Sequence, residues 1–448
     1  MLSSEIVNKI IDDMLVKKLS SEALEDKYHP TDIAYSIDHI VETKEKLLAF
    51  RRLDYDFAAE VLPLLSDQGK EFVVTEATAE QLGHIIGEME SDDAADILSD
   101  VDDEKAENVL DVLSDEVDEE VTRLMEYDKE SAGGIMQTEL IAVHEDTNIM
   151  KTIELYREMA EQIGEVHNIF IVDADKRLVG VLPVTQLLLN PPGAVIKETV
   201  EETPTIHARL KDDQEHVAEL FKRYDLVSLP VVDEQMKLVG RILFDDIMDV
   251  IEEEADEDMM KMVGADDEAL VQTHTSMKMV RYRLPWLSAS LVGGLVTGWL
   301  IWQFKIALSE FLALAAFIPV VMGMSGNVGT QSSALVIRGL ATGRINIDSL
   351  RQYIEKELIV GMILGLVCGA VAGIVAEIWH GDVWLGIVVA ASIFLSIAVA
   401  AFLGTIIPLL FRFVKIDPAI AGGPIVLALN DITGLVIFFL IATVLLRL

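Results

Sequence analysis

The sequence predicts a multidomain membrane protein in which an acidic soluble half precedes a bundle of membrane-spanning helices. Three observations predict this fold class. Five long apolar stretches follow Leu284, and each reaches the roughly 20 residues that a helix needs to cross a bilayer. The formal net charge is −40, yet the part from Leu284 onward holds eight acids and eight bases, so the whole excess lies in residues 1–283. Two segments of that acidic half also repeat at an offset of 60 residues.

Residues 1–130 are expected to form an acidic helical domain, because they are rich in Leu, Ile, Glu and Asp. A loose pattern of Asp, one residue, Ala and a later apolar residue begins at Asp32, Asp56 and Asp93. Since the spacing is irregular, we predict an α-superhelical domain and not a strict solenoid.

Residues 131–254 contain the repeat. The stretch "IVDADKRLVGVLPVTQLL" from Ile171 matches "VVDEQMKLVGRILFDDIM" from Val231. Each copy has the pattern of a strand, a turn, a second strand and an amphipathic helix. The repeat resembles a tandem pair of α/β CBS domains, which implies a ligand-sensing regulatory module. Adenine nucleotides, ATP among them, are candidate ligands of such a pair, although no motif in this sequence assigns one.

Residues 255–283 have few helix breakers and are expected to form a connecting helix that leads directly into the transmembrane domain, residues 284–448. The five predicted spans are Leu284–Phe304, Phe311–Ile337, Leu358–Trp379, Val383–Phe411 and Pro418–Leu446. Basic residues before the first span and in the second and fourth connections all fall on one side if the N-terminus is cytoplasmic. This pattern predicts a multi-pass plasma-membrane protein whose C-terminus lies outside.

Composition excludes several functions. The acidity argues against nucleic-acid binding, which needs Lys and Arg. A single cysteine, Cys368, leaves no disulfide and no Cys-based zinc site within one chain. An intramembrane protease is a poor alternative, because "HEDTN" at His144 lacks the second histidine of a zinc motif. Asp417 and Asp431 lie 14 residues apart on one predicted helix, roughly 21 Å, too far to act as an aspartyl pair. We therefore expect no enzyme.

The fifth span carries Asp431 within an apolar stretch, at a cost of roughly 2.5–3.5 kcal/mol on insertion scales. No Lys or Arg lies at that depth, so a cation is the simplest partner, and a protonated, hydrogen-bonded aspartic acid is the alternative. Oxygen ligands favour hard ions such as Mg²⁺ or Ca²⁺, with Mn²⁺ also allowed. One aspartate per chain, repeated across the axis of a homodimer, suits a hydrated Mg²⁺.

The second span contains "PVVMGMSGNVGTQSS". Pro319 and the glycines after it are expected to loosen the helix, and Asn327 and Gln331 place polar groups at membrane depth. The segment is either a kink satisfied by neighbouring helices or a part of the ion path, with Asn327 as a candidate ligand.

The order of these parts resembles the MgtE family of magnesium channels and transporters, as do "HPTDIAYSIDHI", "ESDDAADILSDV", "SGNVGTQSS" and "DPAIAGGP" followed by "ND". The resemblance implies a homodimer with the pore on its two-fold axis. It implies Asp431 as the ion-selecting carboxylate and Asp417 as an acid at the cytoplasmic pore end. The chain departs from the common family pattern at Leu427-Ala428, where two threonines are usual, and at Thr330, where an asparagine is frequent.

The resemblance further implies regulatory Mg²⁺ sites on the soluble domains, which would close the pore when cytosolic Mg²⁺ is high. The residues at the implied sites are Asp92, Asp93, Asp96, Asp213, Asp225, Asp246, Asp249, Glu254, Glu257 and Asp258. The expected function is Mg²⁺ entry through a Mg²⁺-gated channel or carrier. A CBS-regulated pathway for Mn²⁺, Co²⁺ or Ca²⁺ remains the alternative.

Overall fold

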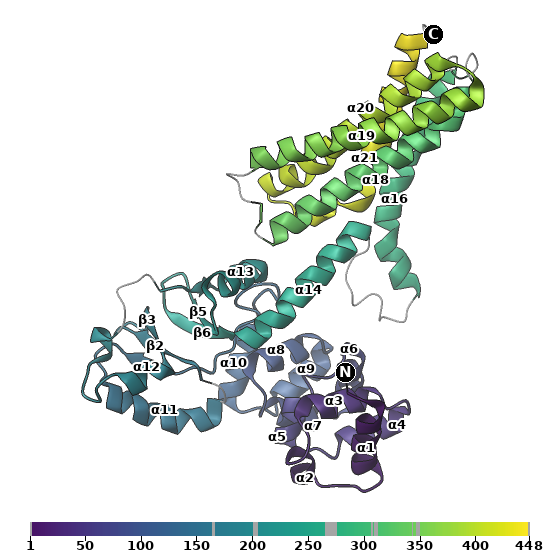
Figure 1. Ribbon diagram of the computed structural model, residues 1–448. Helices are drawn as coiled ribbons and strands as arrows, with labels where there is room; N and C mark the ends of the chain where they lie inside the picture. Colours follow the sequence, from purple (N-terminus) through teal and green to yellow (C-terminus); the bar gives the residue numbers. More distant parts are fainter. Residues whose placement is uncertain are drawn as a thin grey trace. The chain divides into compact units, whose positions relative to one another are not determined.

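The computed structural model describes residues 2–163, 166–199, 205–264, 276–305, 308, 312–342, 344–345 and 350–446. The chain forms two compact units, Met1–Glu253 and Glu254–Leu448 (Figure 1). The first unit holds the helical domain and both repeats, and the second holds the long apolar helices.

Ten short helices build the N-terminal domain, which confirms the helical prediction. Side-chain caps explain where several of them begin, because five residues each accept a hydrogen bond from the first turn of the following helix: Asp54, Ser66, Thr78, Asp102 and Ser114. The helices are α1 Ser4–Leu15, α2 Ser21–Glu25, α3 Pro30–Asp38, α4 Thr43–Phe50, α5 Tyr55–Val61, α6 Asp67–Glu76, α7 Ala79–Ile86, α8 Ser91–Ser99, α9 Asp103–Leu110 and α10 Asp115–Met125.

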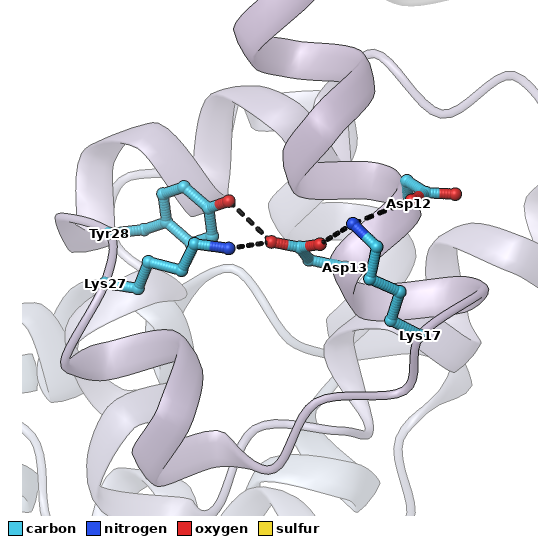
Figure 2. Close-up of polar contacts among 5 residues, drawn as sticks. All are labelled: Asp12, Asp13, Lys17, Lys27 and Tyr28. Carbon is cyan, nitrogen blue, oxygen red and sulfur yellow. Dashed lines mark hydrogen bonds and ion pairs between the residues drawn. The ribbon is translucent and has the colours of Figure 1, made fainter.

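The buried carboxylate of Asp13 stabilises the first helices of this domain. The side chain of Asp13 is 1% exposed and receives the Lys17 ammonium at 2.6 Å, the Tyr28 hydroxyl at 2.7 Å and the Lys27 ammonium (Figure 2). Asp13 belongs to α1, Lys17 follows that helix, and Lys27 and Tyr28 follow α2, so the network links α1 to the segments after α1 and α2. The two ammonium groups and the hydroxyl hold the pKa of Asp13 well below its ordinary value.

The two repeats form equivalent three-stranded sheets. In the first, β1 Ala142–His144 runs parallel to β2 Asn168–Val172, which pairs antiparallel with β3 Leu178–Pro183. In the second, β4 Ala208–Arg209, β5 Ser228–Val232 and β6 Leu238–Leu243 repeat that topology. Their helices are α11 Ile149–Ile163, α12 Val184–Leu189, η1 Ile196–Glu198 and α13 Gln214–Tyr224.

The register confirms the 60-residue repeat. Ile171 pairs with Gly180 in the first sheet, as Val231 pairs with Gly240 in the second, and each antiparallel pair has an irregularity at the next residue. The two copies face each other through reciprocal hydrogen bonds, from the Leu178 amide to the Met236 carbonyl at 2.9 Å and from the Leu238 amide to the Lys176 carbonyl at 3.1 Å.

The last repeat continues into α14, Phe244–Val263. This helix ends at Gly264, which has φ +75°. The predicted connecting helix over 255–283 is therefore not continuous in the described residues: its first part is the end of α14, and residues 276–283 belong to the first long apolar helix. The part of the prediction on residues 265–275 lies outside the described residues.

Five helices of the second unit are long and apolar enough to cross a membrane. They are α16 Ser276–Gln303, α18 Ala313–Ala341, α19 Leu350–His380, α20 Val383–Phe413 and α21 Gly423–Leu446. Helix α20 packs against α18, α19 and α21, and α16 packs against α21 (Figure 1). The five-span prediction is confirmed.

The ends of the spans differ from the prediction by several residues, as at α16 and α19, and two further differences concern the predicted ion-binding residues. Helix α18 runs unbroken through Pro319 and the glycines that follow it, so the expected loosening does not occur. The fifth helix begins at Gly423, not at Pro418, because Pro418–Ala421 forms the short 3₁₀ helix η3 capped by Asp417.

Candidate ion-binding sites

Asp431 lies on α21, about 12 Å along the helix from Gly423, and is half-buried. Its carboxylate faces α18 at Gly326, where a Cβ atom would lie 3.2 Å from Asp431 Oδ1. Among the described residues, no hydrogen-bond donor or cationic side chain contacts this carboxylate. An acidic group thus lies within a membrane-spanning helix, close to a glycine of α18.

The polar residues of α18 divide between two faces. Asn327 and Gln331, one turn apart, are exposed on the unit as it stands, and Thr330 is half-buried. Ser325 is buried and donates to the Val321 carbonyl at 2.8 Å. Polar groups exposed at this depth must meet protein or water, because hydrocarbon cannot satisfy them.

Asn430, which the sequence analysis missed, is fully buried beside α18. A Cβ atom on Gly329 would lie 1.8 Å from Asn430 Nδ2, and one on Gly404 would lie 2.2 Å from the Gly329 carbonyl oxygen. These contacts bring α18, α20 and α21 together next to Asp431. The paired glycines of "SGNVG" were the available signal, but they were interpreted as a weak point of the helix.

Asp417 is the N-terminal cap of η3, the short helix that precedes α21. Its Oδ1 atom accepts a hydrogen bond from the Ala419 amide at 2.8 Å, and its Oδ2 atom accepts one from Lys261 Nζ at 2.7 Å. Lys261 also forms an ion pair with Glu257. The sequence analysis named Asp417 and Glu257 but missed Lys261, which lies 156 residues before Asp417.

Asp258 belongs to the same group of charges. Burial, together with the negative charges of Asp417 and Glu254, raises its pKa to about 6. Burial alone would lower the pKa of Lys261, but its ion pairs with Asp417 and Glu257 raise it above the ordinary value. Three predicted sites, Asp417, Glu257 and Asp258, are thus brought together around one lysine.

A second acidic cluster lies in the first unit, where α8 meets the start of α14. Asp92 is 9% exposed, and burial together with the charge of Asp246 raises its pKa well above the ordinary value. Burial and Glu90 raise the pKa of Asp93 to about 7, and burial and Asp245 raise that of Asp246 to about 7. Such carboxyls need either protons or a cation at neutral pH.

The remaining residues predicted as metal ligands lie at the edge of this cluster or outside it. Asp96 and Asp249 are exposed, each about one turn beyond the clustered acids of its helix, and the charge of Asp249 adds to the raised pKa of Asp93. Asp213 and Asp225 lie at opposite ends of α13, where Asp213 caps the helix and Asp225 ends it with φ +51°. The structure does not bring these last two residues together.

Among the described residues, no three His, Cys, Asp or Glu side chains converge closely enough to form a metal cage. The donors present are carboxylate oxygens in ones and twos. That set fits a hydrated Mg²⁺, which keeps several waters and is held by one or two carboxylates.

Family profiles match three parts of the chain. Residues 318–441 match the MgtE profile described as a divalent cation transporter, residues 28–130 match the MgtE intracellular N domain, and residues 132–191 and 198–253 match the CBS domain.

Curated proteins and solved structures agree with these matches. The chain is 35% identical to the magnesium transporter MgtE of Bacillus subtilis (strain 168) over 421 residues, 93% of this chain and 92% of the relative. It is 34% identical to the magnesium transporter MgtE of Thermus thermophilus over 73% of each chain. A structure of the cytosolic domain of the Mg²⁺ channel MgtE in complex with ATP aligns with 55% of this chain and 99% of that chain, at 30% identity and a TM-score of 0.51.

Proposed function

The chain belongs to the MgtE family, and we propose that it conducts Mg²⁺ across a membrane with Asp431 as the carboxylate that selects the ion. The observation that carries this proposal is the placement of Asp431. It has no protein counter-charge among the described residues, it is half-buried at membrane depth, and the side of α18 facing it is glycine. A dication that passes the site would supply the missing charge.

A homodimer is part of the proposal. Asn327 and Gln331 are exposed on α18 of one chain, and a second copy related by a two-fold axis would enclose them with Asp431 along a water-filled path. Asn327 would then contact the hydrated ion through its amide oxygen, and Asp431 of each copy would hold the ion through its water shell.

We place the soluble unit and Asp417 on the cytoplasmic side. Lys and Arg accumulate in the loops on that side of the predicted topology. In this orientation Mg²⁺ enters past Asp431 and leaves past Asp417.

Regulation follows from the clustered acids. Burial raises the pKa of Asp92, Asp93 and Asp246, and the negative charges of neighbouring acids raise it further. Cytosolic Mg²⁺ bound there would relieve the repulsion between the carboxylates and favour a compact closed state, so that high internal Mg²⁺ stops further entry.

We retain the division of the chain into four parts as a proposal. These parts are the helical domain 1–130, the CBS pair 131–254, the connecting helix 255–283 and the pore domain 284–448. We also propose ATP binding at the CBS pair, on the basis of the ATP complex of the related cytosolic domain.

A pathway for another divalent ion is the second candidate, and one contact favours it. Leu427 takes the place of a threonine common in the family, and its Cδ1 atom would lie 2.6 Å from a Cβ atom on Gly326. An apolar side chain thus flanks Asp431 where a hydroxyl would hydrogen-bond the water shell of an ion.

Ion uptake into liposomes tests the proposal. Full-length protein should take up Mg²⁺ in preference to Ca²⁺, Mn²⁺ and Co²⁺ presented at equal concentrations, and internal Mg²⁺ should slow that uptake. Preference for Mn²⁺, Co²⁺ or Ca²⁺ would favour the second candidate, and no uptake of any divalent ion would contradict both.

A further inference from the structure

Lys261 forms an ion pair with Asp417 at the proposed pore end and has no role in the mechanism above. Its side chain is 19% exposed, and it reaches from the last turns of α14 to Asp417 at 2.7 Å while also pairing with Glu257. Both Asp417 oxygens are therefore engaged, Oδ2 by Lys261 and Oδ1 by the Ala419 amide. An ion that coordinates Asp417 directly through Oδ2 must displace the lysine.

The backbones around this ion pair touch closely. Gly423 has φ +42°, and a Cβ atom on it would lie 2.2 Å from the Met262 carbonyl oxygen. A Cβ atom on Gly264 would lie 2.8 Å from Pro424 Cγ. Glycine at both positions lets the end of α14 rest directly on the start of α21. The ion pair thus lies where the end of α14 packs closely against the start of α21, and not at a loose surface contact.

We propose that Lys261 is a tethered cation that occupies Asp417 in the closed state and competes there with the permeating Mg²⁺. This inference rests on the proposed function and adds a specific regulatory residue to it. The lysine ammonium is a compact point charge, so it can neutralise a carboxylate as a metal ion would. Withdrawal of the end of α14 would remove Lys261 and free Asp417 for the ion. Closure thus combines packing against Gly423 with removal of a negative charge from the ion path.

Uptake measurements on Lys261→Met test the charge. We expect the internal Mg²⁺ concentration that halves uptake to rise about fivefold, since a partly exposed ion pair of this kind contributes about that factor to an equilibrium. Lys261→Arg keeps the charge and should retain most of the inhibition. Arg412→Met removes an exposed positive charge from the last turn of α20 and serves as the matched control. Identical inhibition curves for wild type and Lys261→Met would overturn the inference.

A double variant separates pairing from a general electrostatic effect. Asp417→Asn removes the partner, so Lys261→Met should add no further shift in that background. Equal shifts of Lys261→Met in the two backgrounds would mean that the lysine acts elsewhere, and would also overturn the proposal.

Cross-linking tests the contact between the end of α14 and the segment before α21 without relying on transport. A Cβ atom on Gly422 would lie 3.1 Å from Met262 Cα and Cγ, which places two cysteines within disulfide range. In a Cys368→Ala background, Met262→Cys with Gly422→Cys should cross-link faster at high Mg²⁺ than in EDTA, and the disulfide should block uptake until it is reduced. Gly422→Cys alone is the control. Absence of cross-linking at any Mg²⁺ concentration would overturn the inference, whereas a wild type that carries no Mg²⁺ would contradict the proposed function instead.

Discussion

Two buried aspartates of the first unit differ in the sign of their neighbours' charges. Asp13 is surrounded by two ammonium groups and a hydroxyl, which lower its pKa. Burial raises the pKa of Asp92, and the nearby charges of Asp246, Asp93 and Glu90 raise it further. The first carboxylate stabilises the fold when ionised, and the second destabilises it when ionised. Replacement by asparagine should therefore change stability in opposite directions.

Asp13→Asn should destabilise the N-terminal helices at neutral pH. The contribution of Asp13 is fully present above the unfolded-state pKa of 3.8 and is lost as pH falls through the lower folded-state value. At pH 7 we expect amide hydrogens of α1 to exchange about tenfold faster in the variant, because charge-assisted hydrogen bonds are lost. The difference should shrink as the pH drops below 4. Equal exchange in both proteins at pH 7 would contradict this assignment.

Asp92→Asn should stabilise the Mg²⁺-free protein, because it removes one charge from a buried acidic cluster. We expect a gain of roughly 1 kcal/mol in thermal unfolding of the soluble unit, and a smaller further stabilisation by Mg²⁺ than in the wild type. Asp111→Asn, an exposed acid at the end of α9, is the control. A less stable variant with an unchanged Mg²⁺ effect would remove this cluster from the regulatory sites.

At the scale of elements, glycines determine how closely the long helices pack. A Cβ atom on Gly369 of α19 would lie 2.6 Å from the Ala390 carbonyl oxygen of α20, whereas Gly298 of α16 has no atom within 4 Å of that position. Gly369→Val should therefore cost about 1–3 kcal/mol through overpacking. Gly298→Val should change stability little. Thermal unfolding in detergent measures both, and equal midpoints for the two variants would contradict the packing argument.

Some features of these helices and strands could be predicted from the sequence, and others could not. Long apolar runs and the 60-residue repeat are local patterns, and they correctly predicted five spans and two matching sheets. Pro319 and the glycines after it suggested a loosened or kinked helix, but α18 is continuous. A membrane helix tolerates proline, and Gly326 and Gly329 make room for α21. The pairing of Lys261 with Asp417 could not be predicted, because the partners are 156 residues apart and meet only through tertiary packing.

At the scale of the whole molecule, the net charge of −40 is concentrated before the first span. Such self-repulsion opposes a compact soluble unit unless cations bind it. Limited proteolysis of the full chain should therefore proceed more slowly in millimolar Mg²⁺ than in EDTA. A monovalent salt at matched ionic strength controls for screening. Cleavage of the soluble unit at the same rate and sites in all three conditions would count against regulation by Mg²⁺.

The central claim concerns Asp431, and its neutral replacement tests that claim most directly. Mg²⁺ uptake into liposomes should fall at least about tenfold in Asp431→Asn, because the ion loses its charge partner at membrane depth. Glu377→Gln, at an exposed acid near the end of α19, should behave as wild type. If Asp431→Asn, folded and reconstituted to the same extent, carried Mg²⁺ at the wild-type rate and with the wild-type order of ions, Asp431 would not be the selecting group.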